Sequence, residues 1–165
     1  MGVTITSALK LSSLRDLRVL WLTLLGLGFL KPAPGTIGSL LAVILWWFFF
    51  SAFQISIQLI FLLTYTAASV WLCKSVIEAY ELQDPAEIIA DEFAGMWLAL
   101  VFVPRAIGFA IAAFVLFRLL DIFKPYLIGW VDRNIHGGVG VMMDDLLAGA
   151  ATGLILVFVN YVLEI

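Results

Sequence analysis

Charged side chains are scarce in this sequence. Aspartate, glutamate, lysine and arginine make up 13% of the 165 residues, which is about half their share in a typical soluble domain. Three stretches, residues 32–73, 106–117 and 146–163, contain none of these residues. A chain of this length cannot bury three such runs in one soluble core, so the composition predicts an integral membrane protein.

Cysteine and histidine each occur once. A single cysteine excludes an intrachain disulfide, and the place of Cys73 in an apolar run favours a packing role. A single histidine, His136, excludes catalytic sites that are built on two histidines. No continuous basic stripe is present, so no nucleic-acid partner is predicted.

Five apolar segments are candidates for membrane helices: 19–30, 37–50, 55–73, 93–117 and 146–163. Pro104 divides the fourth into two short helices, because proline disfavours a helical residue before it. Crossing a bilayer takes about 20 helical residues, so we predict that 19–30 is re-entrant or interfacial and that 55–73 spans the membrane. The predicted fold is all-α, a helical integral membrane protein with several short and re-entrant helices.

The order of these segments predicts that the charged loops gather on one membrane face. If the loop at 31–36 lies on one side, the helices that follow return 74–92 and 118–145 to that same side. Basic residues near the N-terminus and in 118–145 predict that this face is cytoplasmic. Arg105 is the one basic residue expected on the opposite face.

Two pairs of adjacent acids, Asp91-Glu92 and Asp144-Asp145, each precede an apolar run that carries Ala-Gly within a turn. Small residues allow helices to approach closely, which would bring the two pairs together. Acidic N-caps explain one acid per helix. Two adjacent acids at the edge of hydrocarbon also suit a hard divalent cation with oxygen ligands, Mg²⁺ above all. The spacing leaves both interpretations open.

Arg118, Asp121 and Lys124 are spaced i, i+3, i+6, so a helix places them on one broad face. One interpretation is a surface string of salt bridges, which contributes little energy. The other is that these cations, together with Arg133, bind phosphoryl oxygens beside the acids, because arginine and lysine both stabilise phosphate.

Two further stretches have a structural and a functional interpretation. The glycine-rich run 137–140 is either a phosphate-binding loop or a flexible connector, and it lacks the Walker lysine. His136 before it is either a general acid or base, or a hydrogen-bond partner of a loop carbonyl. Near the N-terminus, Thr36 and Ser39 either cap the helix that follows or help its N-terminus to hold an anion.

Taken together, these stretches resemble the phosphatidylglycerophosphatase A family. The resemblance rests on PGTIGS (34–39), DEFAGMW (91–97), FRLLDIFKP (117–125) and DRNIHGGVGVMMDDLLAG (132–149), which occur in the family's order. One departure is Tyr126, where some members have a second proline. The resemblance begins near residue 28 and thereby predicts an N-terminal basic or interfacial segment, 1–27, ahead of a helical membrane phosphatase domain, 28–165.

The resemblance implies a Mg²⁺-dependent enzyme of the bacterial cytoplasmic membrane. Such an enzyme hydrolyses a phospholipid substrate in the bilayer, phosphatidylglycerophosphate, to phosphatidylglycerol and inorganic phosphate, a reaction of phospholipid biosynthesis. The protein would be multi-pass, with its active site facing the cytoplasm. No oligomeric state is predicted.

On this basis we expect metal ligands, further catalytic residues and substrate-binding residues. The metal ligands are Asp91, Glu92, Asp144 and Asp145, the further catalytic residues are Asp121 and Lys124, and the substrate-binding residues are Lys31, Thr36, Ser39, Arg118, Arg133 and His136. Either water or an aspartate is the nucleophile. The alternative from another class is an ion or solute transporter, because broken helices with an acidic cation site also build transport sites.

Overall fold

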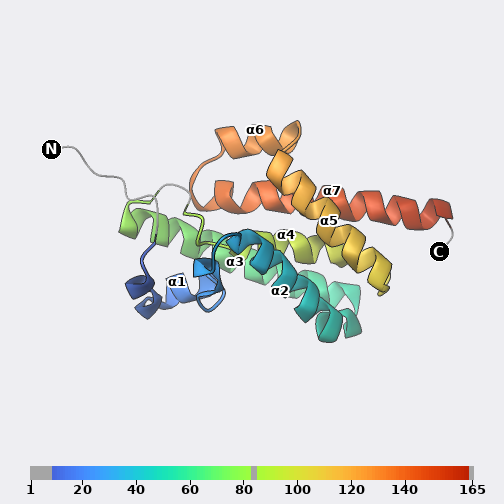
Figure 1. Ribbon diagram of the computed structural model, residues 1–165, viewed down its shortest axis with the longest axis horizontal. Helices are drawn as coiled ribbons and strands as arrows, with labels where there is room; N and C mark the ends of the chain where they lie inside the picture. Colours follow the sequence, from blue (N-terminus) through green and yellow to red (C-terminus); the bar gives the residue numbers. More distant parts are fainter. Residues whose placement is uncertain (1–8, 83–84, 164–165) are drawn as a thin grey trace.

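The computed structural model describes residues 9–82 and 85–163, and its regular elements within these residues are all helical. Three helices are long and apolar enough to cross a membrane: Pro34–Ala52, Ile55–Tyr80 and Gly137–Leu163. These helices confirm the predicted all-α membrane class. Figure 1 shows α7 running along the molecule, with α6 folded back over its beginning.

The elements follow one another along the chain with short connections. In order they are η1 (Leu11–Arg15), α1 (Leu17–Leu22), η2 (Leu27–Phe29), α2 (Pro34–Phe48), η3 (Phe50–Ala52), α3 (Ile55–Tyr80), α4 (Ala90–Leu100), α5 (Ile107–Phe123), α6 (Leu127–Asn134) and α7 (Gly137–Leu163). The break predicted at Pro104 separates α4 from α5, and α5 ends immediately before Lys124-Pro125.

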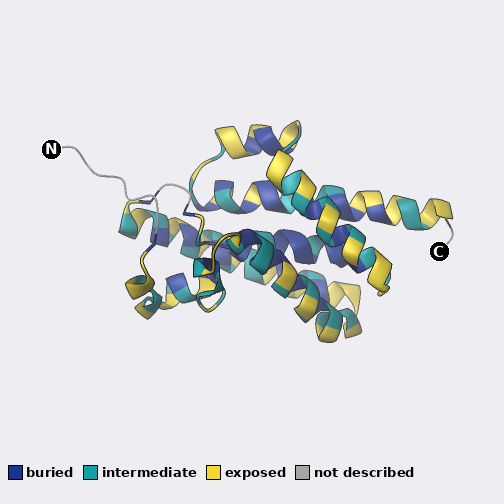
Figure 2. Cartoon of the chain, in the orientation of Figure 1, coloured by how far each residue is buried: buried dark blue, intermediate teal, exposed yellow. Residues whose placement is uncertain are grey.

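The short helix α4 forms the centre of the bundle. Eight of its eleven residues are buried, and it packs against α2, α3, α5 and α7. Figure 2 shows this contrast, with buried residues along α4 and exposed residues on the outer helices. Large apolar side chains such as Leu63 and Trp71 on α3 and Phe158 on α7 are exposed. An apolar outer surface of this kind suits lipid contact.

Glycines bring α4 and α7 together at backbone distance. A Cβ atom at Gly95 would overlap the backbone carbonyl of Asp145, and a Cβ atom at Gly149 would overlap the carbonyl of Gly95. Side chains at either position would therefore push the two helices apart. This close approach is the one that the Ala-Gly pattern predicts, and it places the carboxylate pairs of the two helices beside each other.

We expect Gly149→Ala to destabilise the protein by about 1–3 kcal/mol, because an added methyl group overpacks a contact between two backbones. The matched control is Gly108→Ala, at a helical position where a Cβ atom meets no atom within 4 Å. There alanine should be neutral or stabilising by up to about 1 kcal/mol, since glycine is a poor helix former. The midpoint of thermal unfolding in detergent measures both variants, and equal midpoints would contradict the packing described.

The segment 19–30 does not form one continuous helix. Its helix, α1, ends at Leu22, and a turn follows in which Leu24, Leu25 and Gly26 have positive φ values. The amide of Ile89 donates a hydrogen bond of 3.0 Å to the carbonyl of Leu22, which ties the turn to the start of α4. A chain reversal of this kind agrees with the predicted re-entrant or interfacial segment. The predicted domain boundary between residues 27 and 28 stays a prediction.

The glycine-rich run 137–140 is helical, so the loop predicted there is wrong. It forms the first turn of α7, which starts at Gly137 rather than near residue 146. A Cβ atom at Gly138 would overlap the carbonyl of Val70, and one at Gly140 would overlap the carbonyl of Ile135. The glycines therefore allow close packing of this turn, and that packing outweighs the low helix propensity of glycine.

Candidate active site

A cavity of about 460 Å³ opens where one end of each main helix converges. Its lining comes from the N-terminal parts of α2, α4 and α7, from the C-terminal ends of α3 and α5, from α6, and from the connections before α4 and α7. The titratable residues of the lining are Asp91, Glu92, Asp121, Lys124, Asp132, His136, Asp144 and Asp145. The gathering of charges at one end of the bundle, predicted from the order of the loops, is therefore present in the described residues.

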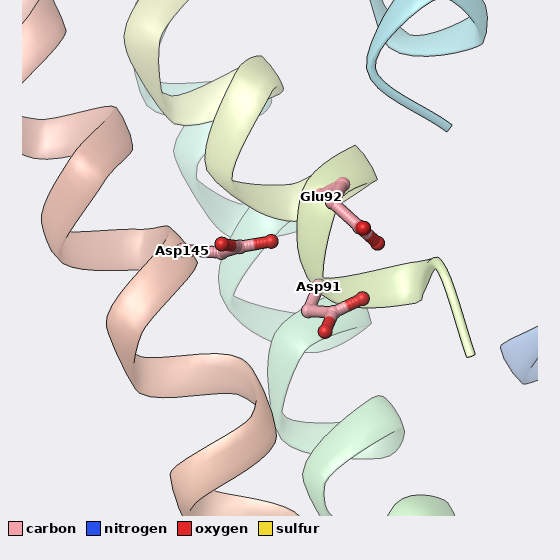
Figure 3. A group of neighbouring side chains, drawn as sticks. All are labelled: Asp91, Glu92 and Asp145. Atoms are coloured by element: carbon pink, nitrogen blue, oxygen red, sulfur yellow. The ribbon is translucent and has the colours of Figure 1, made fainter. Parts of the chain in front are cut away.

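Three carboxylates meet between α4 and α7 (Figure 3). One oxygen from each of Asp91, Glu92 and Asp145 lies within 4.8 Å of the other two. Asp145 is 3% exposed, and Asp91 Oδ1 and Glu92 Oε2 are buried without a hydrogen-bond partner. Buried carboxylate oxygens without partners are costly. Two such oxygens beside the buried carboxylate of Asp145 fit a hard divalent cation such as Mg²⁺, which takes oxygen ligands.

Helix capping does not account for this cluster. The N-cap residue of α4 is Ile89, which has no oxygen in its side chain. Asp91 and Glu92 lie in the first turn of α4, where the helix dipole favours negative charge. Asp145, however, lies in the third turn of α7, well past its N-terminus. The favourable effect of a helix end is therefore absent at the third carboxylate.

Burial shifts the pKa of the two acids on α4, which lie outside the three candidate spans. It raises the pKa of Asp91 well above its usual value, and repulsion from Glu92 adds to this shift. Burial likewise raises the pKa of Glu92, to about 8, with a further contribution from Asp145. A cation among these groups would favour their charged forms.

Asp144 is directed to a different partner from Asp145. Lys124 Nζ donates hydrogen bonds to Asp144 Oδ2 and, at 2.6 Å, to Asp132 Oδ1. Burial works to lower the pKa of Lys124, but these two hydrogen bonds outweigh it and raise the pKa above its usual value. Lys124 is therefore a charged group at the cavity wall. The predicted ligand pair is divided, with Asp145 in the carboxylate cluster and Asp144 on Lys124.

Arg118 lies beside the cavity, held by two neighbours. Its Nη1 is 2.7 Å from Asp121 Oδ2 and donates a hydrogen bond of 3.4 Å to Ser39 Oγ. The Ser39 hydroxyl in turn donates to the carbonyl of Gly35 at 2.9 Å. A Cβ atom at Gly35 would overlap Glu92 Oε1 and lie 3.1 Å from Arg118 Nη1. The absence of a side chain at Gly35 therefore lets α2 pass close to both charged groups.

The structure separates the predicted substrate-binding residues. Of these, His136 lines the cavity. Arg118 and Ser39 are not part of the lining, but each contacts a lining residue, Asp121 and Gly35 respectively. The others, Lys31, Thr36 and Arg133, are not part of the lining. Their predicted roles stay predictions.

Asp132 is a cavity residue that the sequence analysis missed. It lies on α6 and receives a hydrogen bond from Lys124, eight residues earlier. The turn at Lys124-Pro125 lies between the two residues, so no helical spacing relates them. The sequence feature that could have indicated Asp132 is the scarcity of charged residues, which makes each acid in 118–145 a candidate site residue.

Comparisons with known proteins give one consistent match. Residues 20–160 match the family described as Phosphatidylglycerophosphatase A. An Escherichia coli protein named Phosphatidylglycerophosphatase A is 38% identical over 143 residues, which cover 84% of this chain and 83% of that protein. A Haemophilus influenzae protein of the same name is 34% identical over 82% of this chain and 84% of that protein.

A third relative has a different name. This Bacteroides thetaiotaomicron protein is provisionally named a phosphatidylinositol-3-phosphatase, and it is 37% identical over 84% of this chain and 90% of its own length. No solved structure gives a significant match.

Proposed function

Because the chain belongs to the phosphatidylglycerophosphatase A family, we propose that it hydrolyses phosphatidylglycerophosphate to phosphatidylglycerol and inorganic phosphate with Mg²⁺ as cofactor. The observation that carries this proposal is the meeting of Asp91, Glu92 and Asp145 beside Lys124 in one cavity. A metal with a lysine beside it is an arrangement that binds and polarises a phosphoryl group.

The carboxylate cluster supplies the ligands in this proposal. Asp91, Glu92 and Asp145 would hold the Mg²⁺ ion, and the buried, unpartnered oxygens of Asp91 and Glu92 are groups that a cation would satisfy. When bound, a divalent ion supplies Lewis acidity toward phosphoryl oxygens and makes a water more acidic.

Lys124 and Arg118 supply fixed positive charge for the phosphoryl oxygens. Lys124 is held at the cavity wall by Asp132 and Asp144, and Arg118 is held by Ser39 and by Asp121, which lines the cavity. Groups that are preorganised toward developing negative charge lower a reaction barrier, because they do not have to reorient during the reaction. The acids that hold these two cations are positioning residues in this proposal.

The depth of the cavity suits a lipid headgroup. It lies at the ends of α2, α3 and α7, the three helices able to cross a membrane. Apolar helices and bacterial relatives identify a bacterial membrane protein. We propose further that the cavity faces the cytoplasm, which the basic residues of its face support. Arg105 lies at the other end of the bundle, where its Nη2 donates a hydrogen bond of 2.9 Å to the carbonyl of Trp47 near the end of α2.

A transporter would need carboxylates open to both faces, and no observation favours that alternative.

Phosphate release from a panel of phosphomonoesters tests the reaction and the substrate. The panel includes phosphatidylglycerophosphate, phosphatidylinositol 3-phosphate, which the name of one relative suggests, and water-soluble glycerol 3-phosphate. We expect the highest kcat/KM for phosphatidylglycerophosphate. A preference for phosphatidylinositol 3-phosphate would reassign the substrate, and no phosphate release from any of the three would overturn the proposed reaction.

A further inference from the structure

A second cavity, also of about 460 Å³, lies between α3 and the start of α7. We call it the α3–α7 groove. Its lining consists of Ala67, Val70, Trp71, Lys74, Ile77, Glu78, His136, Gly137, Gly138 and Val139. Three of these residues, Ile77, His136 and Gly137, also line the catalytic cavity. The two cavities are therefore neighbours that share a wall.

The α3–α7 groove lies on the lipid-facing side of the bundle. Both of its helices are candidate membrane spans, and Trp71 on its wall is 69% exposed. Along α3 the groove runs from the shared residue Ile77, through Lys74, to Ala67. Ala67 is about 10 Å further from the catalytic cavity than Lys74, at the helical rise per residue. The groove therefore extends from the charged end of the bundle toward the bilayer interior.

Lys74 is the cation of the groove. Its Nζ is 3.9 Å from Glu78 Oε1, and both side chains are about two-thirds exposed. An exposed ion pair of this length contributes little energy, so an anion can replace Glu78 at small cost. The residues before Lys74, from 32 to 73, carry no charge. Lys74 thus marks the depth at which a phosphate and apolar chains would meet.

We propose that the α3–α7 groove binds the diacylglycerol end of the lipid substrate, with Lys74 paired to its phosphodiester. The phosphomonoester then lies at the carboxylate cluster, and the linking glycerol passes His136 and Ile77, which both cavities share. Along α3 the protein presents a polar cavity, then a cation and then an apolar wall. The lipid presents a phosphomonoester, then a phosphodiester and then acyl chains, in the same order. The inference rests on the proposed function, because it assumes a phospholipid that carries a terminal phosphomonoester.

Steady-state kinetics with phosphatidylglycerophosphate in mixed micelles tests the groove. Ala67→Trp fills its apolar end and should raise KM about tenfold without changing kcat. Lys74→Gln should also raise KM about tenfold, since a charge-assisted hydrogen bond is lost, and Lys74→Arg should restore it. The matched control is Leu63→Trp, an exposed position on α3 outside the groove, which should leave both constants unchanged.

The outcomes separate the groove from the reaction. A wild-type enzyme that hydrolyses the lipid, with Ala67→Trp and Lys74→Gln no different from Leu63→Trp, would overturn the groove and leave the proposed function intact. A wild-type enzyme that releases no phosphate from the lipid would overturn the proposed function and the groove with it. A fall in kcat without a change in KM would also contradict the groove, because a binding site for the remote end of the lipid contributes to KM.

Discussion

Asp145→Asn is expected to reduce phosphate release from phosphatidylglycerophosphate by at least about 100-fold at saturating Mg²⁺. Loss of one preorganised electrostatic group in an active site commonly has an effect of this size. Asp145 is 3% exposed, and its carboxylate faces Asp91 and Glu92 across the contact between α4 and α7. Asparagine keeps the shape of the side chain but removes the charge and one ligand oxygen. Initial rates of phosphate release measure the effect.

Asp132→Asn is the matched control for this substitution. Asp132 also lines the cavity, but it is exposed, and in the variant Lys124 keeps its salt bridge with Asp144. We expect a loss of less than about tenfold, because exposed ion pairs are weak. Equal losses in the two variants would contradict the separate role of the carboxylate cluster, and full activity of Asp145→Asn would remove Asp145 from the set of ligands.

Lys124→Met is expected to abolish most activity, by about 100-fold or more, and to destabilise the protein. The activity falls because the cavity loses its fixed cation. The stability falls by about 3–5 kcal/mol, because removal of one partner leaves a buried charge unpaired, and the side chain of Asp144 is 8% exposed. Thermal unfolding in detergent and initial rates measure the two effects separately.

The double variant Lys124→Met/Asp144→Asn distinguishes catalysis from stability. Neutralising Asp144 removes the unpaired charge, so the unfolding temperature should recover toward that of the wild type. The activity should stay low, because the cation is still missing. Recovery of activity together with stability would show that Lys124 only balances the charge of Asp144, which would contradict its role at the phosphoryl group.

Local chemistry made part of the fold predictable from sequence. The break at Pro104 and the end of α5 before Lys124-Pro125 follow from the restriction that proline places on the residue before it. The approach of α4 and α7 follows from small residues, and Gly95 and Gly149 show it at backbone contact. These features depend on neighbouring residues and on the pattern of small residues along one helix, so they can be predicted from the sequence.

The start of α7 was not predictable in the same way. Three glycines in four residues favour a loop by propensity, whereas the structure makes Gly137–Gly140 a helical turn. The reason lies in α3, because Gly138 packs where a Cβ atom would overlap the carbonyl of Val70. A contact between segments almost 70 residues apart in the chain has no local signal.

The division of labour between Asp144 and Asp145 also depended on packing. Adjacent residues on a helix point about 100° apart, so Asp144 and Asp145 leave α7 in different directions, although both line the cavity. The presence of two adjacent acids predicted a charged site. Which of the two lies in the carboxylate cluster depends on the positions of α4 and of Lys124, which packing determines. Asp132 was missed for the same reason, because the turn between α5 and α6 brings it to Lys124.

The most direct measurement is phosphate release from phosphatidylglycerophosphate by the purified wild-type protein, before and after treatment with a chelator and then with added Mg²⁺. Asp145→Asn is measured in parallel. We predict that hydrolysis by the wild type stops in chelator and returns with Mg²⁺, while Asp145→Asn stays inactive throughout. Undiminished hydrolysis in chelator, or full activity of Asp145→Asn, would contradict a metal held by the carboxylates of α4 and α7.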